Sequence, residues 1–154
     1  MTSTTYDRTT APVVHDDPTR RPRRILLLVN GGFLTVVGAL QMSLELLSYY
    51  TGAGPYGADF DASPYTIGWV EAHGLALLIG LLFLLVASDG RRSWHVFAIG
   101  VHLLLGTANL VFWSSFVHFG MVPMGIAATV AHALFVIAHL VALAASRSLQ
   151  RGIR

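Results

Sequence analysis

Residues 67–88, IGWVEAHGLALLIGLLFLLVAS, form an apolar run whose only ionisable side chains are Glu71 and His73, both near its beginning. A helix needs about 20 apolar residues to cross a bilayer core about 30 Å thick. The run does not alternate between polar and apolar residues, as a strand of a transmembrane barrel would. A segment in lipid must also satisfy its own backbone hydrogen bonds, which a helix does. The stretch is therefore predicted to be a membrane-spanning helix.

Three further apolar segments have a similar length, at about 25–48, 93–115 and 121–146. Of the 154 residues, 54% are hydrophobic and only 12% are charged, against about 25% charged residues in a soluble domain. We predict an all-α polytopic membrane protein, with four transmembrane helices in an antiparallel bundle over residues 25–146. A disordered tail at 1–24, too polar to bury much surface, and a second tail at 147–154 would flank the bundle.

The basic residues indicate the orientation of the predicted bundle. All ten are arginines, and they precede the first span, lie between the second and third, or follow the fourth: Arg8, Arg20, Arg21, Arg23, Arg24, Arg91, Arg92, Arg147, Arg151 and Arg154. The loops at 49–66 and 116–120 have none. The positive-inside rule then predicts a multi-pass protein of the cell's inner (plasma) membrane, with both termini cytoplasmic. We expect the cluster Arg20, Arg21, Arg23 and Arg24 to meet anionic lipid head groups.

Several classes of function are excluded or left unsupported by the sequence. The chain has no cysteine, which excludes disulfides, thiolate catalysis, iron–sulfur clusters and zinc sites built on cysteine. The segment GTANLVFW lies inside an apolar span and lacks the glycines and lysine of a phosphate-binding loop. No catalytic serine motif or nucleic-acid-binding surface is found, so nucleic acid is not an expected partner.

Polar side chains within spans usually face other helices or a water-filled cavity. In the first span Gln41 and Glu45 lie on one helical stripe, and Glu45 is expected close enough to the outer end to reach head-group water. In the second span Glu71 and His73 point about 200° apart. We therefore expect Glu71 at the interface, with His73 deeper and on another face.

The histidines of the third and fourth spans recur every seven residues, which nearly restores their direction on a helix. His95 and His102 form one such series, and His132 and His139 the other. A hairpin folded about residue 118 would bring His102 level with His132, and His95 level with His139. The predicted polar interior comprises Gln41, Glu45, His73, His102, Asn109, Thr129, His132 and His139.

Three chemical interpretations stand beside a purely structural one. A b-type haem would use His102 and His132, although neighbouring helices about 8–10 Å apart leave little room for it. A metal site would draw on Glu45, Glu71 and His73, with His102 approaching from below, but no motif such as HExxH supports one. A proton or small-solute path could follow the polar interior. The favoured expectation is a non-enzymatic, accessory membrane component with a histidine-bearing interior and no cofactor.

The segments EAHGLALLIG and HLLLGTANLVFW look like motifs of an uncharacterised family. In span count, loop lengths and termini-in topology, residues 25–146 resemble the small four-span bacterial membrane proteins, of actinobacterial type, that are grouped as DoxX-like. The resemblance implies a link to respiratory or redox-stress complexes, and it identifies no functional residue. Assembly as a homo-oligomer or within a larger membrane complex is left open.

Overall fold

The computed structural model describes residues 18–152, and their side chains as far as residue 145. This part of the chain is all-helical: α1 (Arg20–Thr51), η1 (Gly57–Asp59), α2 (Thr66–Val86), η2 (Ala87–Asp89), α3 (Arg92–Val111), α4 (Trp113–His118) and α5 (Val122–Gly152). Four helices, α1, α2 with η2, α3 and α5, are long and apolar enough to cross a membrane. The predicted class of four-helix membrane protein is therefore confirmed. Most of the predicted disordered tail, residues 1–17, lies outside the described residues.

Two of the helices extend beyond the predicted spans. Helix α1 begins at Arg20, so residues 20–24, which the sequence predicts as the end of the disordered tail, are helical instead. Pro22 is accommodated because the first turn of a helix needs no N–H from it. Helix α5 continues to Gly152, which makes residues 147–152 helical as well. The hydrophobic pattern did not predict these helix ends, because they consist of charged and polar residues beyond the apolar runs.

The third predicted span ends early. Helix α3 stops at Val111, and the short helix α4 follows as a separate element. Gly120, with φ of 67°, then takes the left-handed conformation that glycine adopts without strain. Its N–H bonds to the carbonyl of Val117, at 3.1 Å. The chain turns there into α5, which carries Pro123 in its first turn.

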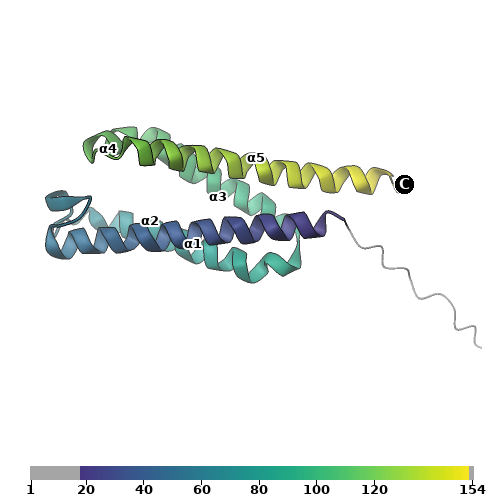
Figure 1. Cartoon of the computed structure of the whole chain (residues 1–154), viewed down its shortest axis with the longest axis horizontal. Helices are drawn as coiled ribbons and strands as arrows, with labels where there is room; N and C mark the ends of the chain where they lie inside the picture. Colours follow the sequence, from purple (N-terminus) through teal and green to yellow (C-terminus); the bar gives the residue numbers. More distant parts are fainter. Residues whose placement is uncertain (1–17, 153–154) are drawn as a thin grey trace, which may run out of the picture.

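The helices pack mainly as two antiparallel pairs, α1 with α2 and α3 with α5. Figure 1 shows the start of α1, the α2–α3 connection and the end of α5 at one end of the molecule. We call this the arginine end, because it carries Arg20–Arg24 and Arg91–Arg92. The opposite end, the loop end, is formed by residues 52–65 and by α4 with its flanking turns.

Glycines allow the backbones of α1 and α2 to touch. A Cβ added to Gly80 would lie 2.5 Å from the backbone nitrogen of Thr35, and one added to Gly38 would lie 2.6 Å from that of Leu77. Such contacts are typical of small residues in membrane helix interfaces. On the outside of the bundle, large apolar side chains such as Val36, Leu85 and Leu104 are mostly exposed. This surface is suited to lipid.

Candidate functional site

Five buried polar side chains form a hydrogen-bonded chain where the two helix pairs meet. Asn30 of α1 lies at its centre, with its Oδ1 atom 2.8 Å from Nε2 of His102 and its Nδ2 atom 2.9 Å from Nε2 of His139. The Nδ1 atoms of His102 and His132 are 2.8 Å apart, as are those of His139 and His95. Each of the five residues is at most 8% exposed. We call this set the histidine–asparagine chain.

The two imidazole pairs, His102 with His132 and His95 with His139, are those predicted by folding the hairpin about residue 118. Asn30 and His95 were not among the predicted interior residues. The seven-residue spacing already pointed to His95, and Asn30 continues the polar stripe of the first span. The spacing did not reveal that α1 would insert one amide between the imidazole pairs of α3 and α5, because that depends on how the helix pairs dock.

The Asn30 amide determines where the protons lie when all four imidazoles are neutral. Its oxygen only accepts hydrogen bonds, so Nε2–H of His102 donates to it, which leaves Nδ1 of His102 to accept from Nδ1–H of His132. On the other side, Nδ2–H of Asn30 donates to Nε2 of His139, whose Nδ1–H donates to His95. The chain thus ends in a bare Nε2 on His132 and an N–H at Nε2 of His95.

Rotation of the Asn30 amide by 180° reverses every one of these bonds. The amide nitrogen would then donate to Nε2 of His102, and the oxygen would accept from His139. Each imidazole would carry its proton on its other nitrogen, and the chain would end in an N–H on His132 and a bare nitrogen on His95. The same five side chains therefore support two arrangements of opposite polarity, the property that a chain for stepwise proton transfer requires.

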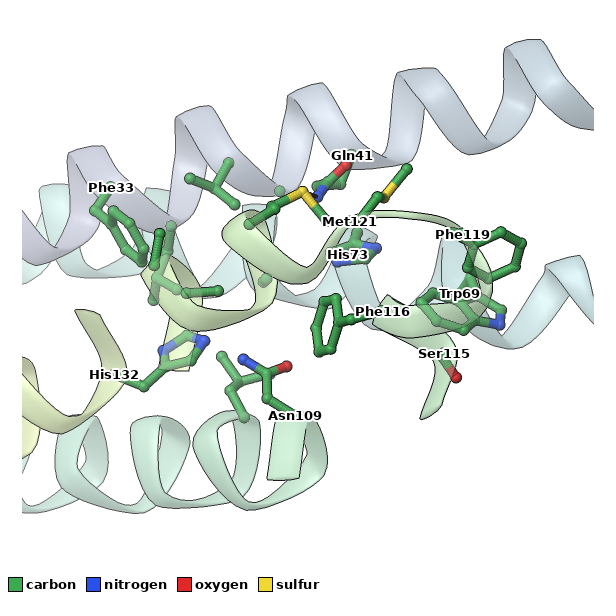
Figure 2. A pocket seen from close by; sticks show the side chains of 18 of the residues that line it. Phe33, Gln41, Trp69, His73, Asn109, Ser115, Phe116, Phe119, Met121 and His132 are labelled. Carbon is green, nitrogen blue, oxygen red and sulfur yellow. Dashed lines mark hydrogen bonds between the residues drawn. The ribbon is translucent and has the colours of Figure 1, made fainter. Parts of the chain in front are cut away.

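The His132 end of the histidine–asparagine chain reaches a cavity of about 310 Å³ (Figure 2). The cavity lies toward the loop end and draws residues from all five α-helices and from the loops. Polar side chains occupy several of its sides: Gln41, Tyr56, His73, Asn109, Ser115 and His132. Most of the remaining lining is aromatic or aliphatic, with Met121 and Met124 among it. His132 thus belongs both to the cavity and to the chain.

Glu45 is buried, contrary to the expectation that it reaches head-group water. Its side chain is 0% exposed, and its Oε1 atom lies 2.5 Å from Nδ1 of His73. Helix α1 continues to Thr51, past the predicted end of the span, so Glu45 sits deeper than expected. Its Oε2 atom has no hydrogen-bond partner. Glu71 is exposed.

An aromatic cluster closes the cavity toward the loop end. Tyr56 stacks on Phe60, with ring centroids 4.5 Å apart, and Phe119 and Trp69 pack against them. The hydroxyl of Tyr56 donates to Oε1 of Gln41 at 3.1 Å. Burial, and to a lesser degree the nearby Glu45 carboxylate, raises the pKa of Tyr56 to about 12. The loop from α1 to α2 therefore serves as a cover, which its turn-rich sequence did not indicate.

Two other polar side chains make contacts that the sequence did not specify. The hydroxyl of Thr129 donates to the carbonyl of Gly125 in its own helix, at 2.8 Å, so its bond is local. Arg23 is 7% exposed and lies near enough to His95 to act on it electrostatically, whereas its neighbours Arg21 and Arg24 are exposed. The side chain of one arginine in the cluster predicted to meet lipid head groups is thus buried within the bundle.

The imidazoles fit a hydrogen-bonded chain better than an iron or zinc site. Two nitrogen ligands of one metal ion, each bonded at about 2.0–2.1 Å, must be separated by more than the 2.8 Å between the Nδ1 atoms of His102 and His132. A haem between them would need still more space. Among the described residues, no group of three or more His, Cys, Asp or Glu side chains could hold a metal ion.

The fold defines the chain as a multi-pass helical membrane protein. No family model, curated protein or solved structure matches it.

Proposed function

We propose that this protein moves protons along the axis of its bundle. The observation that carries the proposal is the unbroken chain from His132 to His95, which crosses the interface between the helix pairs. Intramembrane ionisable residues are costly, and where they line up they mark ion or proton paths. The Glu45–His73 pair lies on the far side of the cavity and would exchange protons with the loop end.

Transfer would proceed in short hops. A proton arriving at Nε2 of His132 lets that ring pass its Nδ1 proton to His102, which passes its Nε2 proton to Oδ1 of Asn30. The amide gains a proton on oxygen as it loses one from nitrogen to His139, through its imidic acid form. His139 then protonates His95, and Nε2 of His95 releases a proton toward the arginine end. The imidic acid returns to the amide when its O–H proton is transferred to the nitrogen, and rotation of the rings and the amide then restores the starting polarity.

Proton flux into liposomes tests this function. With a pH-sensitive dye inside and a potassium diffusion potential as driving force, the wild-type protein should acidify the lumen faster than protein-free vesicles. Asn30→Leu, which keeps the branching at Cγ but removes both hydrogen bonds, should lower the rate at least tenfold, and so should His102→Ala. His118→Ala is the matched control, because His118 is an exposed histidine whose side chain lies outside the histidine–asparagine chain, bonded to Asp59 and packed on Phe119.

Two outcomes would contradict the proposal. One is a wild-type rate equal to that of empty vesicles, and the other is a rate that Asn30→Leu and His102→Ala leave unchanged. A purely accessory, structural role for the histidine–asparagine chain would give a third set of results. The variants would then unfold at lower temperature, as judged by circular dichroism, while neither they nor the wild type conducted protons.

We further propose that the arginine end faces the cytoplasm of the plasma membrane, since arginine is retained on that side. Because the chain has no cysteine, a single introduced cysteine is a unique label. Ala58 and Ser88 are exposed and lie at the loop end and the arginine end, respectively. A membrane-impermeant maleimide should label Ala58→Cys in intact cells and Ser88→Cys only after lysis. The reverse pattern would show the opposite orientation.

A further inference from the structure

We infer that the cavity is a binding site for a small, mainly apolar molecule that carries one hydroxyl group, such as a phenol or an alcohol. The cavity, about 310 Å³, lies at the lower end of the range of roughly 300–1,000 Å³ found for small-molecule sites. Its lining combines a predominantly apolar wall with a few polar groups, which is typical of such sites. Among the described residues that line it, none is Arg, Lys, Asp or Glu.

Asn109 provides an unused hydrogen-bond donor in this cavity. Its Nδ2 atom is buried and has no hydrogen-bond partner, and a buried donor without a partner costs about 1–3 kcal/mol. Figure 2 shows the nitrogen end of the Asn109 amide turned toward His132. A Cβ on Gly106 would lie 3.3 Å from Cβ of His132. Asn109 follows Gly106 by one helical turn on the same face, which places it next to His132.

His132 provides the complementary acceptor. With the Asn30 amide as the structure places it, the proton of His132 is on Nδ1, so Nε2 is bare on the cavity side of the chain. A hydroxyl group satisfies both neighbours, because its oxygen accepts from Asn109 while its O–H donates to His132. A ketone or an ether can accept the bond from Asn109 but has no hydrogen to donate to His132. A carboxylate or an ammonium ion would find no opposite charge in the lining.

The wall of the cavity indicates that the rest of the molecule is apolar. Phe116, Trp69 and Met124 line it, and Sδ of Met124 already accepts a bond from Nε2 of Gln41, at 3.2 Å. Water alone would leave most of this wall in contact with a polar liquid. An aromatic or aliphatic body would bury it, at about 25 cal/mol per Å² of apolar surface removed from water.

This inference concerns the same cavity as the proposed function, because its ligand would occupy the gap between His73 and the histidine–asparagine chain. A bound hydroxyl can donate its proton to His132 while its oxygen takes up another proton from the side of His73, whereas a bound ether has no proton to donate. Binding itself needs no proton flux. The site and the proton path can therefore fail separately.

Photolabelling tests the site. The probe is a phenol bearing a trifluoromethyl-diazirine group, and its methyl ether, which cannot donate a hydrogen bond, is the matched compound. After near-ultraviolet irradiation of the protein in liposomes, mass spectrometry should locate a saturable adduct on the segment containing Met121 and Met124. Excess 1-naphthol should compete for it. Asn109→Leu and the methyl ether should each reduce this labelling at least fivefold. Thr107→Val, an exposed site on the same helix, should leave it unchanged.

Labelling that is confined to lipid-facing residues and never saturates would overturn the site. So would equal labelling by the phenol and its methyl ether, or labelling that Asn109→Leu does not alter. Saturable labelling at Met121 and Met124 without any proton flux would leave the site standing and reject the proposed function. Proton flux without saturable labelling would leave the proposed function standing and reject the site.

Discussion

Asn30 has an unusual position for a single amide in a membrane bundle. Its oxygen bonds to His102 on one side and its nitrogen to His139 on the other, and the residue is 0% exposed. Leucine in its place would leave Nε2 of both His102 and His139 without a partner, in a medium where unpaired polar groups are costly. One side chain of α1 thus both joins the helix pairs and fixes the polarity of four histidines.

Glu45 and His73 form a second polar contact near the loop end, in which Glu45 is buried and His73 is partly exposed. Glu45→Leu should destabilise the protein by about 1–3 kcal/mol, because it leaves the partly buried His73 without its hydrogen-bond partner. The double variant Glu45→Leu/His73→Leu should recover most of that loss. Unfolding in detergent, titrated with sodium dodecyl sulfate, measures both.

Glu71→Leu is the matched control for this pair, since Glu71 is exposed and only two positions from His73. It should change the free energy of unfolding little. If Glu45→Leu is no more destabilising than Glu71→Leu, or if the double variant is less stable than Glu45→Leu alone, the two residues are not energetically coupled.

At the scale of elements, the two sides of the bundle are held together differently. Helices α1 and α2 meet through glycines such as Gly31 and Gly80, whose backbones touch. Helices α3 and α5 meet instead through their paired histidines, with His102 against His132 and His95 against His139. The α1–α2 contact depends on close packing of the backbones, and the α3–α5 contact depends on hydrogen bonds between side chains. Added side-chain volume should therefore disturb the first, and loss of a polar group the second.

Gly80→Ala tests the glycine contact. The added Cβ would lie 2.5 Å from the backbone nitrogen of Thr35 and 2.8 Å from the carbonyl oxygen of Gly31, so α1 and α2 must move apart. Such overpacking costs about 1–3 kcal/mol, which should appear as a lower unfolding temperature. Gly100→Ala is the control, because a Cβ there would meet nothing within 4 Å and alanine favours helix. Equal effects of the two substitutions would refute the contact.

The elements were largely predictable from the sequence, because apolar runs of about 20 residues leave few alternatives in a bilayer. Their ends were less so: α1 starts at Arg20 and α3 stops at Val111, since polar residues can extend a helix past the bilayer and a local turn can end it early. The seven-residue spacing predicted the histidine pairs. It could not predict that Asn30 links them or that the loop carrying Tyr56 covers the cavity, because both depend on contacts between distant segments.

Over the whole molecule, polar groups follow the axis of the bundle within an apolar exterior. They begin at Glu45 and His73, continue around the cavity, and run through the histidine–asparagine chain to His95, near the start of α3 at the arginine end. The proposed proton path and the proposed hydroxyl site both depend on this arrangement, and above all on the hydrogen bonds between imidazoles.

Nuclear magnetic resonance of the protein in lipid bilayers, with its histidines labelled with ¹⁵N, measures those bonds directly. We predict two nitrogen–nitrogen couplings across hydrogen bonds, one joining the Nδ1 atoms of His102 and His132 and the other those of His95 and His139. His132→Ala should abolish the first and leave the second. Each of the four rings should show one protonated and one bare nitrogen. Four rings without mutual coupling, each bonded to water or to the backbone, would contradict the chain and the proton path proposed on it.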